Sequence, residues 1–159
     1  MNEKDLDITM VNPFIGAAGE VFKSLFKCEL VKGQISLKKD PSATNEIAII
    51  IGVTGDIYTG VVVYSLKKYS ALKLVSYLDS TINGEKDQSF SDALGEIANI
   101  ISENAMSVFT TQGISLNITT PSVIIGKAFE IHLLDQTTIS AEMQSPFGPL
   151  EINVAIKKI

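Results

Sequence analysis

Residues Ser89–Gly113, with the sequence SFSDALGEIANIISENAMSVFTTQG, decide how the chain folds, because they form its longest segment of helical periodicity. At 100° per residue, the apolar residues fall on one side of a helix that runs from about Ser89 to Thr111. These residues are Leu94, Ile97, Ala98, Ile101, Ala105 and Val108. Gly113 stands where a C-terminal glycine commonly ends a helix. The segment therefore predicts a long amphipathic helix whose apolar side is buried against a sheet.

The opposite side of this helix carries a polar stripe, formed by Asp92, Glu96, Asn99 and Glu103. Their spacing of i, i+4, i+7 and i+11 places all four within about 40° of a common line along the helix. Such a stripe can be the solvated face of an amphipathic helix. Two details favour a function instead: asparagine is a poor residue for a helix interior, and no lysine is interleaved to form the usual i, i+4 ion pairs. We therefore take the polar stripe as the candidate site.

Towards the N-terminus, the chain predicts a helix, three strands and a short helix. Apolar residues recur at three- and four-residue steps from Asp7 to Lys27, and Asn12-Pro13 either starts this helix or interrupts one that begins near Asp5. Segments rich in β-branched residues then predict strands. They cover residues 29–38, 46–53 and 57–66. The turn Thr54-Gly55-Asp56 joins the last two strands as a hairpin, and residues 70–78 predict the short helix.

Beyond Gly113 the sequence predicts strands only. A strand at 116–118 is interrupted at Pro121, resumes through 122–125 and is expected to end at Gly126. Three further strands are expected, at residues 129–134, 137–143 and 150–156.

The order helix, strands, helix, helix, strands predicts an α+β fold in two pseudo-symmetric halves, with a mostly antiparallel sheet packed against long helices. A short similarity supports the two halves: residues 19–23 read GEVFK and residues 95–99 read GEIAN. With 159 residues, the chain predicts a single domain over residues 1–159.

Composition argues against several functional classes. The chain has 13 lysines, no arginine and a net charge of −5, so it lacks the guanidinium groups that read bases and clamp phosphates, and we expect no nucleic-acid partner. The longest apolar stretch, Ile47–Val53, is too short to cross a membrane, which needs about 20 residues. Cys28 is the one cysteine, and acidic residues stand near Met1 where a secretory signal would be basic. These features predict a cytoplasmic protein.

The segment Asp92–Asn99, followed after 21 residues by Pro121, resembles the active-site signature of the CheC/CheX/FliY family of chemotaxis phosphatases. The core of that signature is an acid or serine, then Glu, then Asn three positions later. The resemblance covers most of the chain, because flanking segments agree as well. These are Val11-Asn12-Pro13, residues 51–56 with Gly60, and residues 121–126.

The family removes the phosphoryl group from the aspartyl phosphate of the response regulator CheY, so the resemblance implies a CheY phosphatase. It implies that Asn99 orients the hydrolytic water and that Glu96 contacts the active-site lysine of the partner, which makes these two the expected catalytic residues. Asp92 and Glu103 are expected to complete the partner-binding surface. The chain offers no metal cluster and no cofactor of its own, so Mg²⁺ is expected to be supplied by CheY.

The first predicted helix departs from the family pattern. Glu20 is followed three positions later by Lys23 instead of an amide, so one active site per chain is expected. This favours the CheX type, whose members are homodimers, over the CheC type. Two alternatives stay open: a non-catalytic CheY-binding module of the flagellar-switch type, and a CheC-like adaptor for the deamidase CheD.

Other candidate residues favour structural roles. His132 is the only histidine and falls in a predicted strand, where packing explains it better than catalysis. Cys28 is interpreted as a half-buried packing residue rather than a nucleophile. Gly52, Gly55 and Gly60 lack the Gly-Lys-Ser/Thr of a phosphate loop and fit a hairpin.

Overall fold

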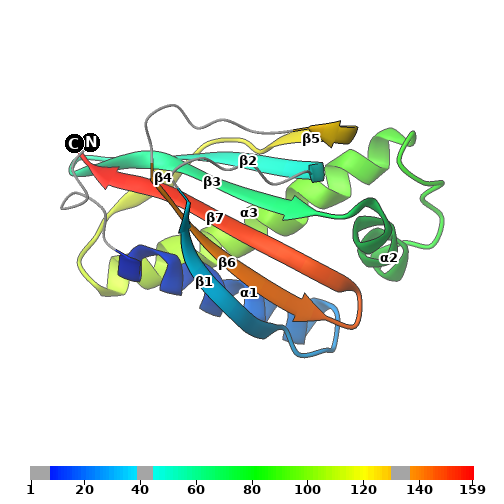
Figure 1. The fold of residues 1–159 in the computed structure, drawn as a ribbon, viewed down its shortest axis with the longest axis horizontal. Helices are drawn as coiled ribbons and strands as arrows, with labels where there is room; N and C mark the ends of the chain where they lie inside the picture. Colours follow the sequence, from blue (N-terminus) through cyan, green and yellow to red (C-terminus); the bar gives the residue numbers. More distant parts are fainter. Residues whose placement is uncertain (1–7, 39–44, 130–136) are drawn as a thin grey trace.

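Seven strands form one antiparallel sheet in the part of the chain that the computed structural model describes, residues 8–38, 45–129 and 137–159. The strands are β1 (Val31–Lys38), β2 (Asn45–Gly55), β3 (Tyr58–Leu66), β4 (Leu116–Ile118), β5 (Ser122–Phe129), β6 (Thr138–Ser145) and β7 (Gly148–Lys158). The helices are α1 (Asn12–Leu25), α2 (Lys68–Leu78) and α3 (Gln88–Thr111), and a 3-10 turn, Ile8–Val11, leads into α1. α1 and α3 pack on one face of the sheet, and α2 lies at one end (Figure 1).

The strand order confirms the two pseudo-symmetric halves of an α+β fold. Along the sheet the order is β1-β6-β7-β3-β2, and both β4 and β5 pair with the outer side of β2. The first half runs α1-β1-β2-β3, and the second runs α3-β4/β5-β6-β7. The counterparts are β1 and β4/β5, β2 and β6, and β3 and β7. When each strand is replaced by its counterpart, the same strand order results, read in the opposite direction, and β3 and β7 pair at the centre. α3, the helix of the second half, packs over β2, β4 and β5.

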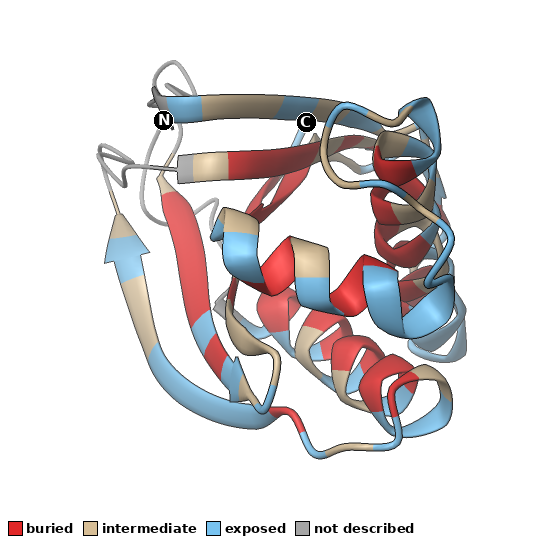
Figure 2. Ribbon diagram, turned by 90° about the vertical axis from the view of Figure 1, so that its right-hand side faces the viewer, coloured by how far each residue is buried: buried red, intermediate tan, exposed pale blue. Residues whose placement is uncertain are grey.

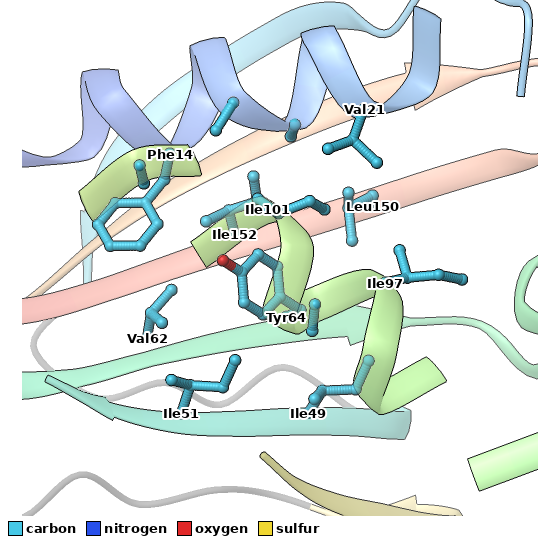
Figure 3. Packing of buried hydrophobic residues seen from close by; sticks show 14 of the residues in the cluster. Phe14, Val21, Ile49, Ile51, Val62, Tyr64, Ile97, Ile101, Leu150 and Ile152 are labelled. Carbon is cyan, nitrogen blue, oxygen red and sulfur yellow. The ribbon is translucent and has the colours of Figure 1, made fainter. Parts of the chain in front are cut away.

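One hydrophobic core fills the space between the sheet and the helices, and the buried sides of the helices turn towards it (Figures 2 and 3). Alternate residues of β2, from Ile47 to Val53, point into this core, as expected for a strand with one face on the helices. Tyr64 of β3 and Ser102 of α3 are both fully buried, and their hydroxyls share a hydrogen bond of 2.7 Å. This bond joins the centre of the sheet to α3.

α3 agrees with its predicted bounds and begins at Gln88, after Asp87, whose side chain caps the backbone N–H of Ser89. Its predicted apolar side is buried as far as Ala105, but Val108 is 39% exposed and the prediction of its burial is wrong. The C-terminal half of α3 packs on α1, where Phe109 meets Phe14 edge to face with ring centroids 5.8 Å apart. At this end of α3 the buried side chains are therefore those of Ala105, Met106 and Phe109, and Val108 lies outside the buried side.

α1 is shorter than the predicted helix over residues 7–27. It begins at Asn12 with Pro13 in its first turn, where proline loses no hydrogen bond, so Pro13 starts the helix rather than interrupting it. The N-cap position is Val11 rather than Asn12, and it makes no side-chain cap; residues 5–7 lie outside the described residues. The helix ends at Leu25, two residues before Lys27, whose φ of 54° is left-handed.

β5 continues through Gly126 to Phe129, so the prediction that Gly126 ends this strand is wrong. The register between β2 and β5 shifts beyond the pair Ile47 and Ile125, so Gly126 lies at an irregularity inside the strand. The rest of the predicted strand at 129–134, including His132, lies outside the described residues. The last two predicted strands are present as β6 and β7.

Candidate functional site

A groove of about 850 Å³ runs between α3 and the connection from β4 to β5. All four residues of the polar stripe line it, on the α3 side. The opposite wall consists of Ile118, Thr119, Thr120, Pro121 and Val123. Pro121, which the family signature places 22 positions after Asn99, thus lies across the groove from the stripe.

The polar stripe projects from the helix side that is turned away from the core. Asp92, Glu96 and Glu103 are exposed, and Asn99 is half-buried. The Asn99 Nδ2 amide donates a hydrogen bond of 3.0 Å to Glu103 Oε1, one turn further along α3. Asp92 Oδ1 accepts one of 3.3 Å from Gln88 Nε2. In the described part of the chain, no hydrogen bond or ion pair engages the carboxylate of Glu96, so that group is open to a partner.

The opposite wall is held in place by a bulge in the chain segment that faces β2. Val53 pairs with Ile118 and Ile50 pairs with Ser122, so three residues of this wall, 119–121, stand opposite two residues of β2. Proline has no N–H to give to a ladder, and Pro121 lies in this bulge, where the regular ladder is already interrupted. The consequence is that residues 119–121 bend out of the strand and form the wall.

Thr119 replaces the ladder bond that the bulge removes. Its backbone N–H donates to the Gly52 carbonyl at 2.9 Å, and its Oγ1 accepts from the Gly52 N–H at 2.8 Å. A Cβ on Gly52 would stand 2.9 Å from Thr119 Cγ2, so this close approach requires glycine. We call this pair of bonds the Thr119–Gly52 clasp. Sequence reasoning missed it, because Gly52 was interpreted only as a hairpin residue.

α3 and the opposite wall approach closely at Gly95. This residue is buried, and a Cβ there would meet Pro121 Cγ at 3.5 Å and Val123 Cγ2 at 3.7 Å. These are ordinary van der Waals distances, so a small side chain is tolerated and a larger one would push the wall outward. Gly95 therefore keeps the base of the groove narrow.

The groove is acidic. Its lining contains three carboxylates, from Asp92, Glu96 and Glu103, and no lysine among the residues that form it. A bare phosphate would be repelled, whereas a partner that carries a cation beside its phosphate would be attracted. Among the described residues, no three His, Cys, Asp or Glu side chains gather to hold a metal ion.

The other candidates lie away from this groove. Glu20 lines a second groove, of about 540 Å³, between α1 and the C-terminal half of α3. Cys28 is half-buried, and burial, followed by the negative charge of Glu29, raises the pKa of its thiol. That shift disfavours the reactive thiolate. In the described residues, no helix is long and apolar enough to span a membrane.

Comparisons with known proteins identify the family. The family model described as Chemotaxis phosphatase CheX matches residues 47–144, which include both walls of the groove. A search of curated proteins finds no match.

Several solved structures share the fold. The chemotaxis protein CheX from Vibrio vulnificus is 24% identical, with a TM-score of 0.84 over 93% of this chain and 99% of that chain. A chemotaxis protein from Desulfovibrio vulgaris Hildenborough is 25% identical, with a TM-score of 0.83 over 93% of this chain and 96% of that chain. The structure of a CheX-CheY-BeF3-Mg²⁺ complex from Borrelia burgdorferi is 23% identical, with a TM-score of 0.79 over 95% of this chain and 99% of that chain. Because the family model covers more than half of the sequence, this chain belongs to the CheX family of chemotaxis phosphatases.

Proposed function

We propose that this protein hydrolyses the aspartyl phosphate of the response regulator CheY, using the polar stripe of α3. The observation that carries the proposal is the position of Asn99: a half-buried carboxamide in an open, acidic groove, with its donor end already bonded to Glu103. The Borrelia burgdorferi neighbour is a complex of CheX with CheY, Mg²⁺ and BeF3⁻, a mimic of the phosphoryl group. This supports an activated CheY as the partner.

In the proposed reaction, Asn99 holds a water molecule in line with the phosphorus. The water oxygen forms a bond to phosphorus while the bond from phosphorus to the aspartyl oxygen breaks, and the carboxylate leaves with the electron pair. The proton released by the water goes to the departing inorganic phosphate. The protein supplies no covalent intermediate, so its contribution is orientation.

Glu96 is assigned to partner binding. Beside a phosphate, a carboxylate is repelled unless a cation lies between them, and the open carboxylate of Glu96 suits the active-site lysine of CheY. Such a pair would also set the position of Asn99 over the phosphoryl group. Asp92 is assigned to the same surface, because it lies one turn before Glu96 on the same wall.

Mg²⁺ is assigned to CheY rather than to this chain. The described residues hold no cluster of three metal-ligating side chains, and the groove carboxylates are spread along α3 instead of converging. When bound on the partner, the ion supplies charge neutralisation at the phosphoryl oxygens. The homodimer, the cytoplasmic location and the single domain over residues 1–159 stay predictions.

The test compares the parent protein with Asn99→Ala, using purified CheY, Mg²⁺ and two readouts. Binding is measured on BeF3⁻-activated CheY by calorimetry, and turnover is measured as release of inorganic phosphate. We expect the variant to bind within about threefold of the parent while its turnover falls by at least about 100-fold. Binding by the parent without faster phosphate release would instead identify a non-catalytic CheY-binding module of the flagellar-switch type.

A further inference from the structure

The hydrogen bond between Asn99 and Glu103 fixes which way the Asn99 carboxamide faces. The two side chains are four residues apart on α3, and Asn99 Nδ2 lies 3.0 Å from Glu103 Oε1. An ionised carboxylate can only accept hydrogen bonds, so the amide must offer its NH₂ end to Glu103. The chemistry of the pair therefore determines the orientation of the amide, and Asn99 Oδ1 is left to face other partners.

This orientation matters for a water that attacks phosphorus. Such a water must keep a lone pair directed at the phosphorus atom, so its own O–H groups must donate to the enzyme. The Oδ1 atom of Asn99 accepts such a bond. An amide turned the other way would present N–H groups, which cannot accept from the O–H groups of the water and instead draw on one of its lone pairs.

Glu103 differs from Glu96 in being engaged within its own chain. It differs from Asp92, which accepts from Gln88, in being bonded to Asn99. Its carboxylate accepts from Asn99, and its backbone carbonyl accepts from Ser107 Oγ at 3.3 Å. In the described part of the chain, Glu103 is the one side chain that bonds the Asn99 amide. Glu96, in contrast, has an open carboxylate and suits a cation of the partner.

We infer that Glu103 is a positioning residue: it holds the Asn99 carboxamide with its oxygen presented to the hydrolytic water, rather than contacting CheY. This inference rests on the proposed function, since it concerns how the proposed catalytic residue is oriented. It replaces the expectation that Glu103 belongs to the partner-binding surface.

The experiment measures kcat and KM for phosphate release from phosphorylated CheY at two salt concentrations. The variants are Glu103→Ala, Glu103→Gln, Asn99→Ala and the Asn99→Ala/Glu103→Ala double variant. Glu20→Ala is the matched control, because Glu20 is an exposed helical glutamate that does not line the groove. Thermal unfolding of each variant confirms that it is folded.

We expect Glu103→Ala to lower kcat about tenfold with KM within about twofold, because the untethered amide then spends most of its time in other rotamers and in the reversed orientation. Glu103→Gln should recover only part of this loss, because its side-chain oxygen can still accept the bond from Asn99 while its NH₂ group can also donate to Asn99 Oδ1 in the opposite orientation. In the Asn99→Ala background, loss of Glu103 should have no further effect, because the residue acts only through Asn99.

Two results would overturn the inference alone. One is an inactive Asn99→Ala protein together with an unchanged kcat for Glu103→Ala. The other is an equal, salt-dependent rise in KM for Glu103→Ala and Glu103→Gln, which would place the charge of Glu103 at the partner surface. A parent-like rate for Asn99→Ala would overturn both the proposed function and this inference.

Discussion

Replacing Tyr64 with phenylalanine should destabilise the protein at neutral pH and stabilise it, relative to the parent, at high pH. The ring of Tyr64 is 1% exposed, so phenylalanine fills the same space and the change removes only the hydroxyl. That hydroxyl shares a 2.7 Å hydrogen bond with Ser102, which is 0% exposed. Leaving a buried hydroxyl without its partner costs about 1–3 kcal/mol. Because Ser102 can turn towards a helix carbonyl, we expect about 1 kcal/mol at pH 7.

The sign reverses with pH because burial raises the pKa of Tyr64 above its value in the unfolded chain. A group of this kind contributes its full stability below the unfolded pKa, near 10, and loses it as the pH rises towards the folded pKa. Above pH 10 the unfolded parent loses a proton that the folded parent keeps, so its stability falls by about 1.4 kcal/mol per pH unit from this residue. The phenylalanine variant has no such term, and the two stability curves should cross near pH 11.

The assay is urea unfolding of both proteins between pH 7 and pH 11.5, followed by circular dichroism. Tyr69→Phe, an exposed tyrosine on α2, controls for the loss of a surface hydroxyl. A stability difference between parent and Tyr64→Phe that stays constant across this pH range would contradict the prediction, because it would mean that Tyr64 ionises as readily in the folded protein as in the unfolded one.

Three further predictions concern the groove and one turn of the fold. Thr119→Val keeps the shape of the side chain but removes the hydroxyl of the Thr119–Gly52 clasp, so its KM for phosphorylated CheY should rise. Thr119→Ser keeps the hydroxyl, and its KM should stay near that of the parent. Equal KM values for the two variants would count against the clasp. Glu96→Gln should raise KM about 3–10-fold and weaken its dependence on salt, and an unchanged salt dependence would argue against a cation partner. Gly148→Ala should lower the unfolding temperature by several degrees in a thermal melt, because Gly148 has a φ of 116° and an added Cβ would lie 2.1 Å from Ser70 Oγ. A parent-like melt for Gly148→Ala would show that this turn relaxes freely.

Local patterns predicted the elements well where neighbouring residues determine them. The spacing of apolar residues in α3 predicted its length and its buried side as far as Ala105, and the order of elements predicted two similar halves. Val108 could not be predicted in this way, because its exposure depends on where α1 crosses α3. Gly126 was interpreted as a strand end, since a glycine at a bulge and a glycine at an end have the same sequence signal.

In the candidate site, too, the part formed by neighbouring residues could be predicted from the sequence, and the part formed by distant residues could not. The polar stripe lies within one helix, so its four residues could be found from their spacing alone. The opposite wall depends on Thr119 and Gly52, which are 67 positions apart, and on a three-against-two pairing with β2 that no local pattern reveals. The i, i+4 spacing of Asn99 and Glu103 allows a hydrogen bond between them. The sequence could not show that Asn99 bonds this acid rather than another one of the stripe, because that depends on the positions of the side chains.

The role of Asn99 in hydrolysis is measured most directly as the decay of radiolabelled aspartyl phosphate on purified CheY with Mg²⁺, alone, with the parent protein and with Asn99→Ala. We expect faster decay with the parent only, and the unassisted rate with the variant. Equal acceleration by both proteins would contradict this role, because Asn99 would then not be the residue that orients the water.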